Sequence, residues 1–343
     1  MKHDITLHRE TPLSSHTTSF TMSDQQYINA VKTLLYPFMF LLLSACQQST
    51  EEPLLRVGTN PWPGYGLFYL ARDLGEYNER EVRLIELPSS TEVTQLLRSG
   101  QIDGAALTLD EALSVVAQGI DIKIILGIDF SKGADVILAK PDIKSFRDLK
   151  GKKVAVETTG VGAILLSAAL EAAHLQLSDI QIVPTMSDHH YETFISGNVD
   201  AVVTFEPIRT KLLQIGAQEL FSSTGITNKI MDVLVIRSDA MALSPQATQQ
   251  LIDGYFSALI YLKAKPQLAA QRMVPHLGLS VKDMLDSYAL LQMLNKHDNQ
   301  KLFNHDADAF KDLSKKTEAI MQKHHLLQHR IPSHNLFIGS FNE

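Results

Sequence analysis

The sequence predicts an α/β protein of two similar lobes, each a mostly parallel sheet flanked by helices. Three observations support this fold class. Strand and helix signals alternate with short turns from residue 54 onward, which is typical of crossover units on a parallel sheet. Part of this alternation recurs 97 residues later, as from Ser99 to Ser196. The length of 343 residues suits two domains of about 150 residues each.

The first lobe is expected to alternate short strands with helices that end at glycine. Apolar residues 67, 70, 71 and 74 form one helical face before Gly75, and residues 93–97 form another before Gly100. Apolar positions three and four residues apart indicate a helical face, and glycine commonly follows the last turn. The strands expected around these helices are 54–59, 82–87 and 102–107.

The second lobe is expected to repeat the first. Residues 99–106 read SGQIDGAA and residues 196–203 read SGNVDAVV, while the pattern of residues 55–72 returns at 153–170. Any two α/β segments of this kind resemble each other to some degree. The shared Ser-Gly-x-x-Asp at nearly equal spacing nevertheless favours a true internal repeat.

Composition excludes several classes of function. The chain has 31 Lys plus Arg against 38 Asp plus Glu and a net charge of -7, which argues against a nucleic-acid partner because phosphate binding needs a clustered basic surface. One cysteine cannot form an internal disulfide, a zinc cage or an iron–sulfur site. His325 and His329 have a ligand-like spacing but lack a third ligand. No metal and no cofactor are expected.

The single cysteine follows an apolar run of 12 residues, 34–45. This run is shorter than a membrane span and suits the apolar core of a secretory signal. Residues 43–46, LSAC, resemble the lipobox of bacterial lipoproteins, in which the cysteine is acylated. The resemblance implies a leader and signal peptide at 1–45 with a start at Met22 as an option, a linker at 46–53, and a lipid on Cys46 that anchors an extracytoplasmic protein to the membrane. The alternative is a buried cysteine after an ordinary helix.

Candidate ligand-binding residues lie where the predicted strands end. Ligands of open parallel sheets bind outside the carboxyl ends of the strands, and two lobes would present these ends across a cleft. In lobe one these positions include Asn60 and the residues after it. Trp62, the only tryptophan, lies between two prolines, where its ring can stack on a planar ligand or hold a cation, or can plug the loop. Tyr65 is either a pocket or a surface residue.

In lobe two, Thr158, Thr159 and Gly160 precede a helix expected at 163–173. Their hydroxyl and backbone N–H groups suit a ligand oxygen or an anion, although an ordinary threonine cap explains the same pattern. Both roles are compatible.

Acidic residues dominate the remaining strand ends. Asp110 and Glu206 occupy nearly equivalent places in the two halves, where either can also cap the following helix, with Pro207 at its first position. Asp129 and Asp232 add further acid. Such a cleft favours a cation or a planar, donor-rich heteroaromatic, for example an aminopyrimidine, over nitrate or a sulfonate. The full set of candidate ligand-binding residues is Asn60, Trp62, Tyr65, Asp110, Asp129, Thr158, Thr159, Gly160, Glu206 and Asp232.

Several of these segments carry a family resemblance. The chain from about residue 54 to 294 is similar to the nitrate/sulfonate/taurine and thiamine-pyrimidine-precursor group of periplasmic substrate-binding proteins, as judged from VGTNPWPGYGLFYLARDLG, LTLDEAL, DLKGKKVAVETTG, VDAVVTFEPIRTKL and MDVLVIR. The resemblance implies a type II periplasmic-binding-protein fold with a two-segment hinge. It places lobe one at 54–140 and 233–305, lobe two at 141–232, and a C-terminal helix and polar tail at 306–343. Helices beginning at Ser244, Pro266 and Ser280 would pack on lobe one.

The same resemblance implies the function. It predicts an extracytoplasmic solute-binding lipoprotein that captures a small organic ligand between its lobes and delivers it to an ABC permease with its ATPase, without catalysis. Two alternatives stay open. One is a ligand-sensing subunit for a membrane receptor, kinase or cyclase, and the other is an enzyme on the same fold. Pyrimidine synthases of this group carry a cysteine-rich motif that the chain lacks, whereas chorismate-type dehydratases leave no such mark.

Overall fold

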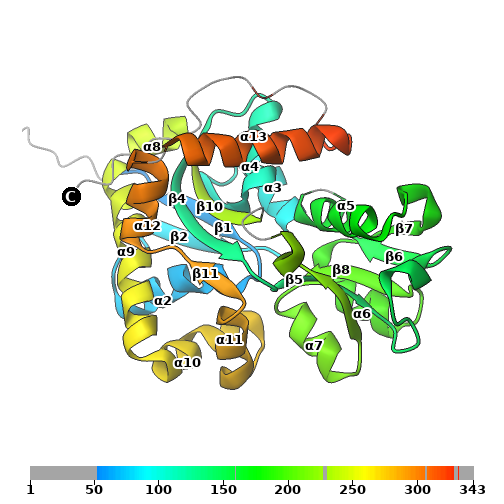
Figure 1. Ribbon diagram of the computed structural model, residues 1–343. Coiled ribbons are helices and arrows are strands. Elements are labelled where there is room, and N and C mark those ends of the chain that lie inside the picture. Colours follow the sequence, from blue (N-terminus) through cyan, green and yellow to red (C-terminus); the bar gives the residue numbers. More distant parts are fainter. Residues whose placement is uncertain (1–51, 159, 227–229, 306, 328–330, 332–343) are drawn as a thin grey trace, which may run out of the picture. The chain divides into compact units, whose positions relative to one another are not determined.

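The computed structural model describes residues 52–158, 160–226, 230–305, 307–327 and 331 (Figure 1). The expected leader, the linker up to residue 51, Cys46 and Thr159 lie outside the described residues. Within the described part, no helix combines the length and the apolar character that a membrane span requires.

The first sheet has six strands in the order β11-β4-β10-β3-β1-β2. Strand β1, which lies between β3 and β2, pairs parallel with both neighbours, whereas β10 pairs antiparallel with β3 and β4. Every residue of β3 is buried, as expected for a strand covered on both faces. The strands are β1 (Leu55–Thr59), β2 (Val82–Glu86), β3 (Gly104–Thr108), β4 (Ile122–Ser131), β10 (Met231–Arg237) and β11 (Leu291–Met293).

The second sheet has five strands in the order β7-β6-β8-β5-β9. Here β6 pairs parallel with both neighbours, and β5 pairs antiparallel with β8 and β9. The strands are β5 (Asp135–Ala139), β6 (Lys153–Val156), β7 (Gln181–Pro184), β8 (Ala201–Phe205) and β9 (Gln218–Ser222).

The internal repeat is confirmed by the topology. The run β1-α2-β2-α3-β3-α4 of lobe one matches β6-α5-β7-α6-β8-α7 of lobe two, and matching strands occupy the same places in the two sheets. The helices of these runs are α2 (Gly66–Leu74), α3 (Ser90–Ser99), α4 (Leu109–Ala117), α5 (Val161–Ala173), α6 (His190–Ile195) and α7 (Ile208–Gln214).

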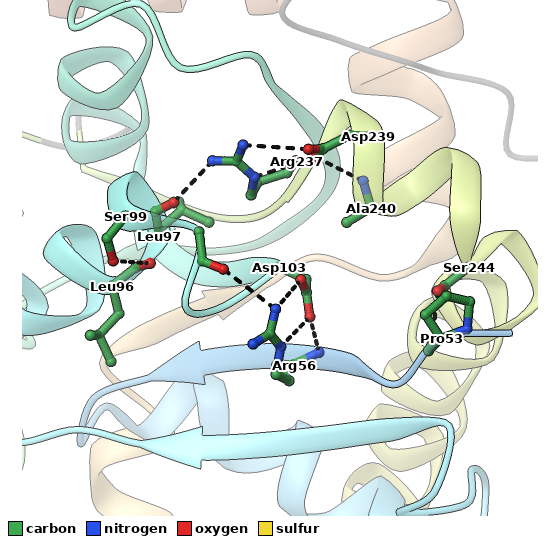
Figure 2. A network of polar contacts seen from close by, with 11 residues as sticks. Pro53, Arg56, Leu96, Leu97, Ser99, Asp103, Arg237, Asp239, Ala240 and Ser244 are labelled. Atoms are coloured by element: carbon green, nitrogen blue, oxygen red, sulfur yellow. Dashed lines mark hydrogen bonds and ion pairs between the residues drawn. The ribbon is translucent and has the colours of Figure 1, made fainter.

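The Ser-Gly-x-x-Asp turn has the same role in both lobes. Gly100 and Gly197 adopt positive φ values of 72° and 77°, a conformation in which a side chain would be strained. Asp103 then accepts a hydrogen bond from the backbone N–H of Arg56 at 2.8 Å and pairs with its guanidinium (Figure 2). Asp200 accepts from the backbone N–H of Lys153 at 3.0 Å. Each turn thereby ties its third strand to the first.

The expected boundary between lobes is corrected at one strand. Strand β5, expected in lobe one as part of 54–140, lies in the second sheet between β8 and β9. The chain therefore leaves lobe one at residues 132–134, directly after β4. It returns at β10, which lies in the first sheet. In each lobe, the strand that comes directly after the crossing from the other lobe, β5 or β10, pairs antiparallel with its neighbours. The parallel pairing expected for most of each sheet therefore holds for three strands in each sheet.

The helices expected after the return are present and pack on lobe one. Ser244 is the N-cap of α9, Pro266 is the first residue of α10, and Ser280 caps α11 by accepting from the backbone N–H of Asp283 at 3.1 Å. Their apolar faces join the core of the first sheet. The helices of this region are α8 (Ser238–Leu243), α9 (Pro245–Ala264), α10 (Pro266–Leu277), α11 (Val281–Tyr288), α12 (Lys296–Gln300) and α13 (Ala307–Lys323).

Candidate functional site

A small cavity lies where the carboxyl ends of strands from both sheets meet. The cavity is narrow: the centre of a water molecule can move within a volume of about 30 Å³. The two lobes therefore approach each other closely around it. Side chains from both lobes form its wall, as expected for the strand ends of two facing sheets. The lining residues are Asn60, Trp62, Tyr65, Ser90, Thr108, Glu111, Asp135, Glu157, Val161, Gly162, Leu165, His190, Val203, Thr204, Phe205, Ile230 and Asp232.

The structure brings four of the expected site residues into this lining. They are Asn60, Trp62, Tyr65 and Asp232. The remaining described candidates do not line it: Asp110, Asp129, Thr158, Gly160 and Glu206.

Trp62 closes one wall of the cavity. It precedes the short 3₁₀ turn Pro63–Tyr65, and its indole Nε1–H donates to Asp129 Oδ2 at 3.2 Å. Its ring meets Phe205 of lobe two edge-on, with centroids 5.9 Å apart. A Cβ on Gly64 would lie 2.1 Å from Asp129 Oδ2, so only glycine lets the turn approach that carboxylate. Trp62 is thus a positioned cavity residue that also contacts the opposite lobe.

Tyr65 and Asp232 form a buried hydrogen-bonded pair. The Tyr65 hydroxyl donates to Asp232 Oδ1 at 2.5 Å, and Asp232 Oδ2 has no hydrogen-bond partner within the described structure. Asp232 lies directly opposite Asp129 in the β4–β10 ladder. Burial, and then the charge of Asp129, raise the pKa of Asp232 well above its usual range. Burial likewise raises the pKa of Asp129 to about 7.

Asp135 is a lining residue that the sequence reasoning missed. It begins β5, is buried, and its Oδ2 has no hydrogen-bond partner among the described residues. Burial raises its pKa to about 7. A sequence signal for it exists: residues 135–138 read DVIL and residues 232–235 read DVLV, 97 residues apart. The repeat thus extends to this acid.

Two further acids line the cavity, one from each lobe. Glu111 caps α4 by accepting from the backbone N–H of Thr108 at 3.0 Å, and burial raises its pKa to about 8. Glu157, at the end of β6, accepts a short hydrogen bond from the hydroxyl of Thr91 in lobe one. A Cβ on Gly160 would lie 2.8 Å from Glu111 Oε1. The Thr91–Glu157 hydrogen bond and the close approach of Gly160 to Glu111 both join the two lobes beside the cavity.

His190 is buried at the lobe-two side of the cavity. Its Nδ1 lies 3.2 Å from the Thr204 hydroxyl, and its Nε2 lies 3.2 Å from the Thr185 carbonyl. The carbonyl accepts only, so Nε2 carries the proton and Nδ1 accepts from Thr204. Burial lowers the pKa of His190 to about 4. At neutral pH the imidazole therefore adds no positive charge to the site.

Glu206 has a structural role at the start of α7. Its carboxylate accepts from the backbone N–H of Thr210 at 3.2 Å and pairs with Arg209 at 3.1 Å. Arg209 also pairs with Glu219. These contacts match the capping role that the sequence left open. Arg209 is thereby held by two carboxylates, and the cavity lining given above contains neither lysine nor arginine.

Thr158 faces a different groove, beside the outer turns of α5. The helix itself begins after Gly160, whose φ is 86°. Among the described residues, no three His, Cys, Asp or Glu side chains are placed to hold a metal ion. The cavity is therefore a site of neutral and acidic groups, with two aromatic rings on one side.

The chain matches a known protein family over more than half of its length. The family described as NMT1/THI5 like matches residues 62–269, a range that begins shortly after β1 and includes elements of both sheets. The chain belongs to this family. The resemblance read from the sequence motifs is thereby confirmed.

Relatives of this NMT1/THI5-like chain carry different names. A putative thiamine biosynthesis protein of Haemophilus influenzae is 25% identical over 255 residues, which cover 72% of this chain and 81% of the relative. A putative aliphatic sulfonates-binding protein of Escherichia coli is 31% identical over 154 residues, 44% of this chain and about half, 48%, of that protein.

Solved structures confirm the fold. The alkanesulfonate-binding protein SsuA from Xanthomonas axonopodis pv. citri, bound to MOPS, matches 84% of this chain and 99% of its own with a TM-score of 0.71 at 18% identity. A Candida albicans protein described as having the generic periplasmic binding protein fold matches 82% of this chain and 98% of its own, with a TM-score of 0.58 at 14% identity. The NMT1/THI5-like chain has the two-lobed periplasmic-binding-protein fold that the sequence predicts.

Proposed function

We propose that the protein is an extracytoplasmic solute-binding protein that captures a small organic ligand between its two lobes and delivers it to an ABC permease with its ATPase. The observation that carries this proposal is the cavity walled by strand ends of both sheets. A ligand held there contacts both lobes at once, so its binding energy favours the closed arrangement. A permease can then distinguish the loaded protein from the empty one by the position of the lobes.

The charge of the cavity supports a class of ligand. Glu111, Asp135, Glu157 and Asp232 line it, and no basic side chain does. A sulfonate or nitrate would meet four acids and a neutral histidine, whereas a cation or a planar heterocycle with N–H donors meets acceptors. The Trp62 ring adds a face for stacking or for a cation. We infer a cationic or aminopyrimidine-like ligand, although one relative is named for binding aliphatic sulfonates.

Calorimetry of the purified full-length protein tests this ligand class. The titrants are acetamidinium and 4-amino-2-methylpyrimidine on one side and taurine, MOPS and nitrate on the other. We expect heat of binding from the first two and none from the anions at pH 7.5. Tight binding of the anions alone would overturn the ligand class while leaving a solute-binding role intact.

We further propose that the protein is held at the membrane by a lipid on Cys46. The support is the LSAC segment after an apolar run of signal-peptide length. Mass spectrometry of the N-terminus of protein from native membranes decides it: we expect a diacylated Cys46 as the first residue, and an intact leader with a free thiol contradicts the proposal.

A further inference from the structure

Two buried acids of the cavity are equivalent positions of the internal repeat. Asp135 and Asp232 are 97 residues apart. Asp135 lies opposite Phe205 at the end of β8, and Asp232 lies opposite Thr108 at the end of β3. Phe205 and Thr108 are themselves 97 residues apart. The repeat therefore places one carboxyl group from each sheet at the same cavity.

Both acids lie at the start of a strand that directly follows a crossing between the lobes. Asp135 follows the crossing at 132–134, and Asp232 is the second residue of β10. The two crossings are bound to each other and to the end of β9: the Ser131 N–H donates to the Ile230 carbonyl at 3.1 Å, and the Gly133 N–H donates to Ser223 Oγ at 2.6 Å. These residues form the hinge between the lobes. The acids thus lie beside the hinge, where a small rotation of one lobe changes their separation least.

Each acid has an oxygen without a hydrogen-bond partner among the described residues. For Asp135 it is Oδ2. For Asp232 it is also Oδ2, because Oδ1 accepts from Tyr65; the facing Asp129 carboxyl hydrogen-bonds to Asp232 when one of the two is protonated, and a ligand donor would replace that shared proton. Asp135 is 3% and Asp232 is 2% exposed. A buried carboxyl oxygen without a partner is costly. Both oxygens belong to side chains that line the same cavity, so one donor-bearing ligand can satisfy both.

We propose that Asp135 and Asp232 form a two-sided acceptor subsite that grips one N–H-bearing group of the ligand, an amidinium or an amino-substituted heteroaromatic ring, with one carboxyl group from each lobe. This deepens the solute-binding function proposed above and rests on it. It assigns the donor group of the ligand to the hinge end of the cavity, between β5 and β10. The ring or chain attached to that group then extends toward Trp62.

The charged surroundings agree with this assignment. The groups that face the pair are acidic or neutral: Tyr65, Asp129 and Glu111 around Asp232, and Asp110 and Glu206 around Asp135. Arg209, which pairs with Glu206, is also engaged by Glu219. Burial raises the pKa of Asp135 to about 7 and that of Asp232 well above its usual range, so the pair holds a proton that a bound cation displaces. Binding is then stronger at higher pH.

Calorimetric titration of the full-length protein with acetamidinium tests the subsite. We expect Asp135→Asn and Asp232→Asn each to weaken binding by tenfold or more. Asp142→Asn, an exposed acid outside the lining, should stay within threefold. Tetramethylammonium, a cation without N–H groups, should not bind. Titrations in phosphate and in Tris should reveal proton release by the unaltered protein that both cavity variants reduce.

The outcomes separate the two proposals. If the unaltered protein binds acetamidinium and both cavity variants bind it equally well, the subsite is wrong and the ligand class stands. If tetramethylammonium binds as well as acetamidinium, charge alone is recognised and the two-sided subsite is also wrong. If only taurine or MOPS binds, the ligand class fails and the subsite with it. Circular dichroism of each variant verifies folding, and a variant that melts early is replaced by Asp135→Ser or Asp232→Ser.

Discussion

Each acid near the cavity has a role set by the donors that reach it. Glu206 receives the backbone N–H of Thr210 and the Arg209 guanidinium, and it serves as a helix cap. Asp129 receives the Trp62 indole and fixes its ring. Asp135 receives no side-chain donor at Oδ2. These carboxyl groups therefore differ in how many of their oxygens receive a donor: both oxygens of Glu206 do, whereas Asp129 and Asp135 each keep one oxygen without a partner among the described residues.

The buried acids in and beside the cavity make the stability of the ligand-free protein depend on pH. Burial raises the pKa of Asp129 and Asp135 to about 7 and of Glu111 to about 8. Folded values above the unfolded ones mean that the stabilisation is complete below about pH 4 and is lost as pH rises through 7 to 8. His190, with a lowered pKa, acts in the opposite direction only below about pH 6.5. We expect the melting temperature to fall between pH 6.5 and 9.

Thermal melts by circular dichroism measure this dependence. Each pKa unit is worth about 1.4 kcal/mol, and about 1 kcal/mol shifts the melting temperature of a chain this size by roughly 2–4 °C, so a fall of about 5 °C or more is expected. Asp135→Asn should reduce the slope, because it removes one of these groups. A melting temperature that is constant from pH 6.5 to 9 would show that the buried acids titrate normally.

The strand-end rule predicted part of the site from the sequence. It located Asn60, Trp62, Tyr65 and Asp232, since these follow or adjoin strands whose apolar runs are clear. Glu111 was missed in favour of the neighbouring Asp110, because the rotation of a helix about its axis decides which of two adjacent residues faces a cavity. Hydrogen-bond donors from distant segments, such as Tyr65 for Asp232, leave no pattern in sequence.

At the scale of elements, the Ser-Gly-x-x-Asp turn shows how a short motif holds a sheet together. In both lobes its carboxylate accepts from the first residues of the central parallel strand. Around the lobe-one turn, Arg237 also donates to the Leu97 carbonyl at 3.2 Å (Figure 2). The turn of lobe one therefore joins α3, β1 and β10, whereas in that of lobe two Asp200 also pairs with Lys140.

Removing the two turn carboxylates tests this role. Asp103→Ala leaves the Arg56 N–H and guanidinium without their acceptor, and Asp200→Ala does the same for the Lys153 N–H. We expect each to lower the free energy of unfolding by about 1–3 kcal/mol, the cost of a partly buried donor left unpaired, with the larger loss for Asp103. Urea denaturation measures it. Asp142→Ala, an exposed control, should change little, and equal midpoints for all three variants would contradict the role.

The elements themselves were largely predictable, but their assignment to lobes was not. Periodicity and glycine ends predicted the strands and helices of both halves, and the repeat predicted that the halves match. Strand β5 was assigned to the wrong lobe because a buried strand such as DVILA has the same apolar run in either sheet. Its partners β8 and β9 are chosen by long-range pairing, for which local sequence holds no signal.

At the scale of the molecule, contacts between the lobes lie on several sides of the cavity. Trp62 meets Phe205, Thr91 bonds to Glu157, Gln214 donates to Asp283 at 3.2 Å, and Lys323 of α13 pairs with Glu171 of α5 at 3.1 Å. The polar contacts at the rim are exposed, and such pairs contribute little individually. The aromatic contact and the Thr91–Glu157 hydrogen bond lie next to the cavity, so these two contacts connect closure most directly to binding.

Phe205→Ala should shift the protein toward an open arrangement of its lobes. An edge-to-face ring pair contributes about 0.5–1.5 kcal/mol beyond its buried area, and a change of about 1.4 kcal/mol alters an open-to-closed ratio tenfold. Small-angle X-ray scattering should therefore give a larger radius of gyration for the ligand-free variant than for the unaltered protein. Saturating acetamidinium should reduce the difference, because the ligand supplies contacts to both lobes. Phe221→Ala removes the same ring from the core of lobe two and should leave the radius unchanged. Identical scattering from the Phe205 variant and the unaltered protein would show that closure does not depend on the ring contact.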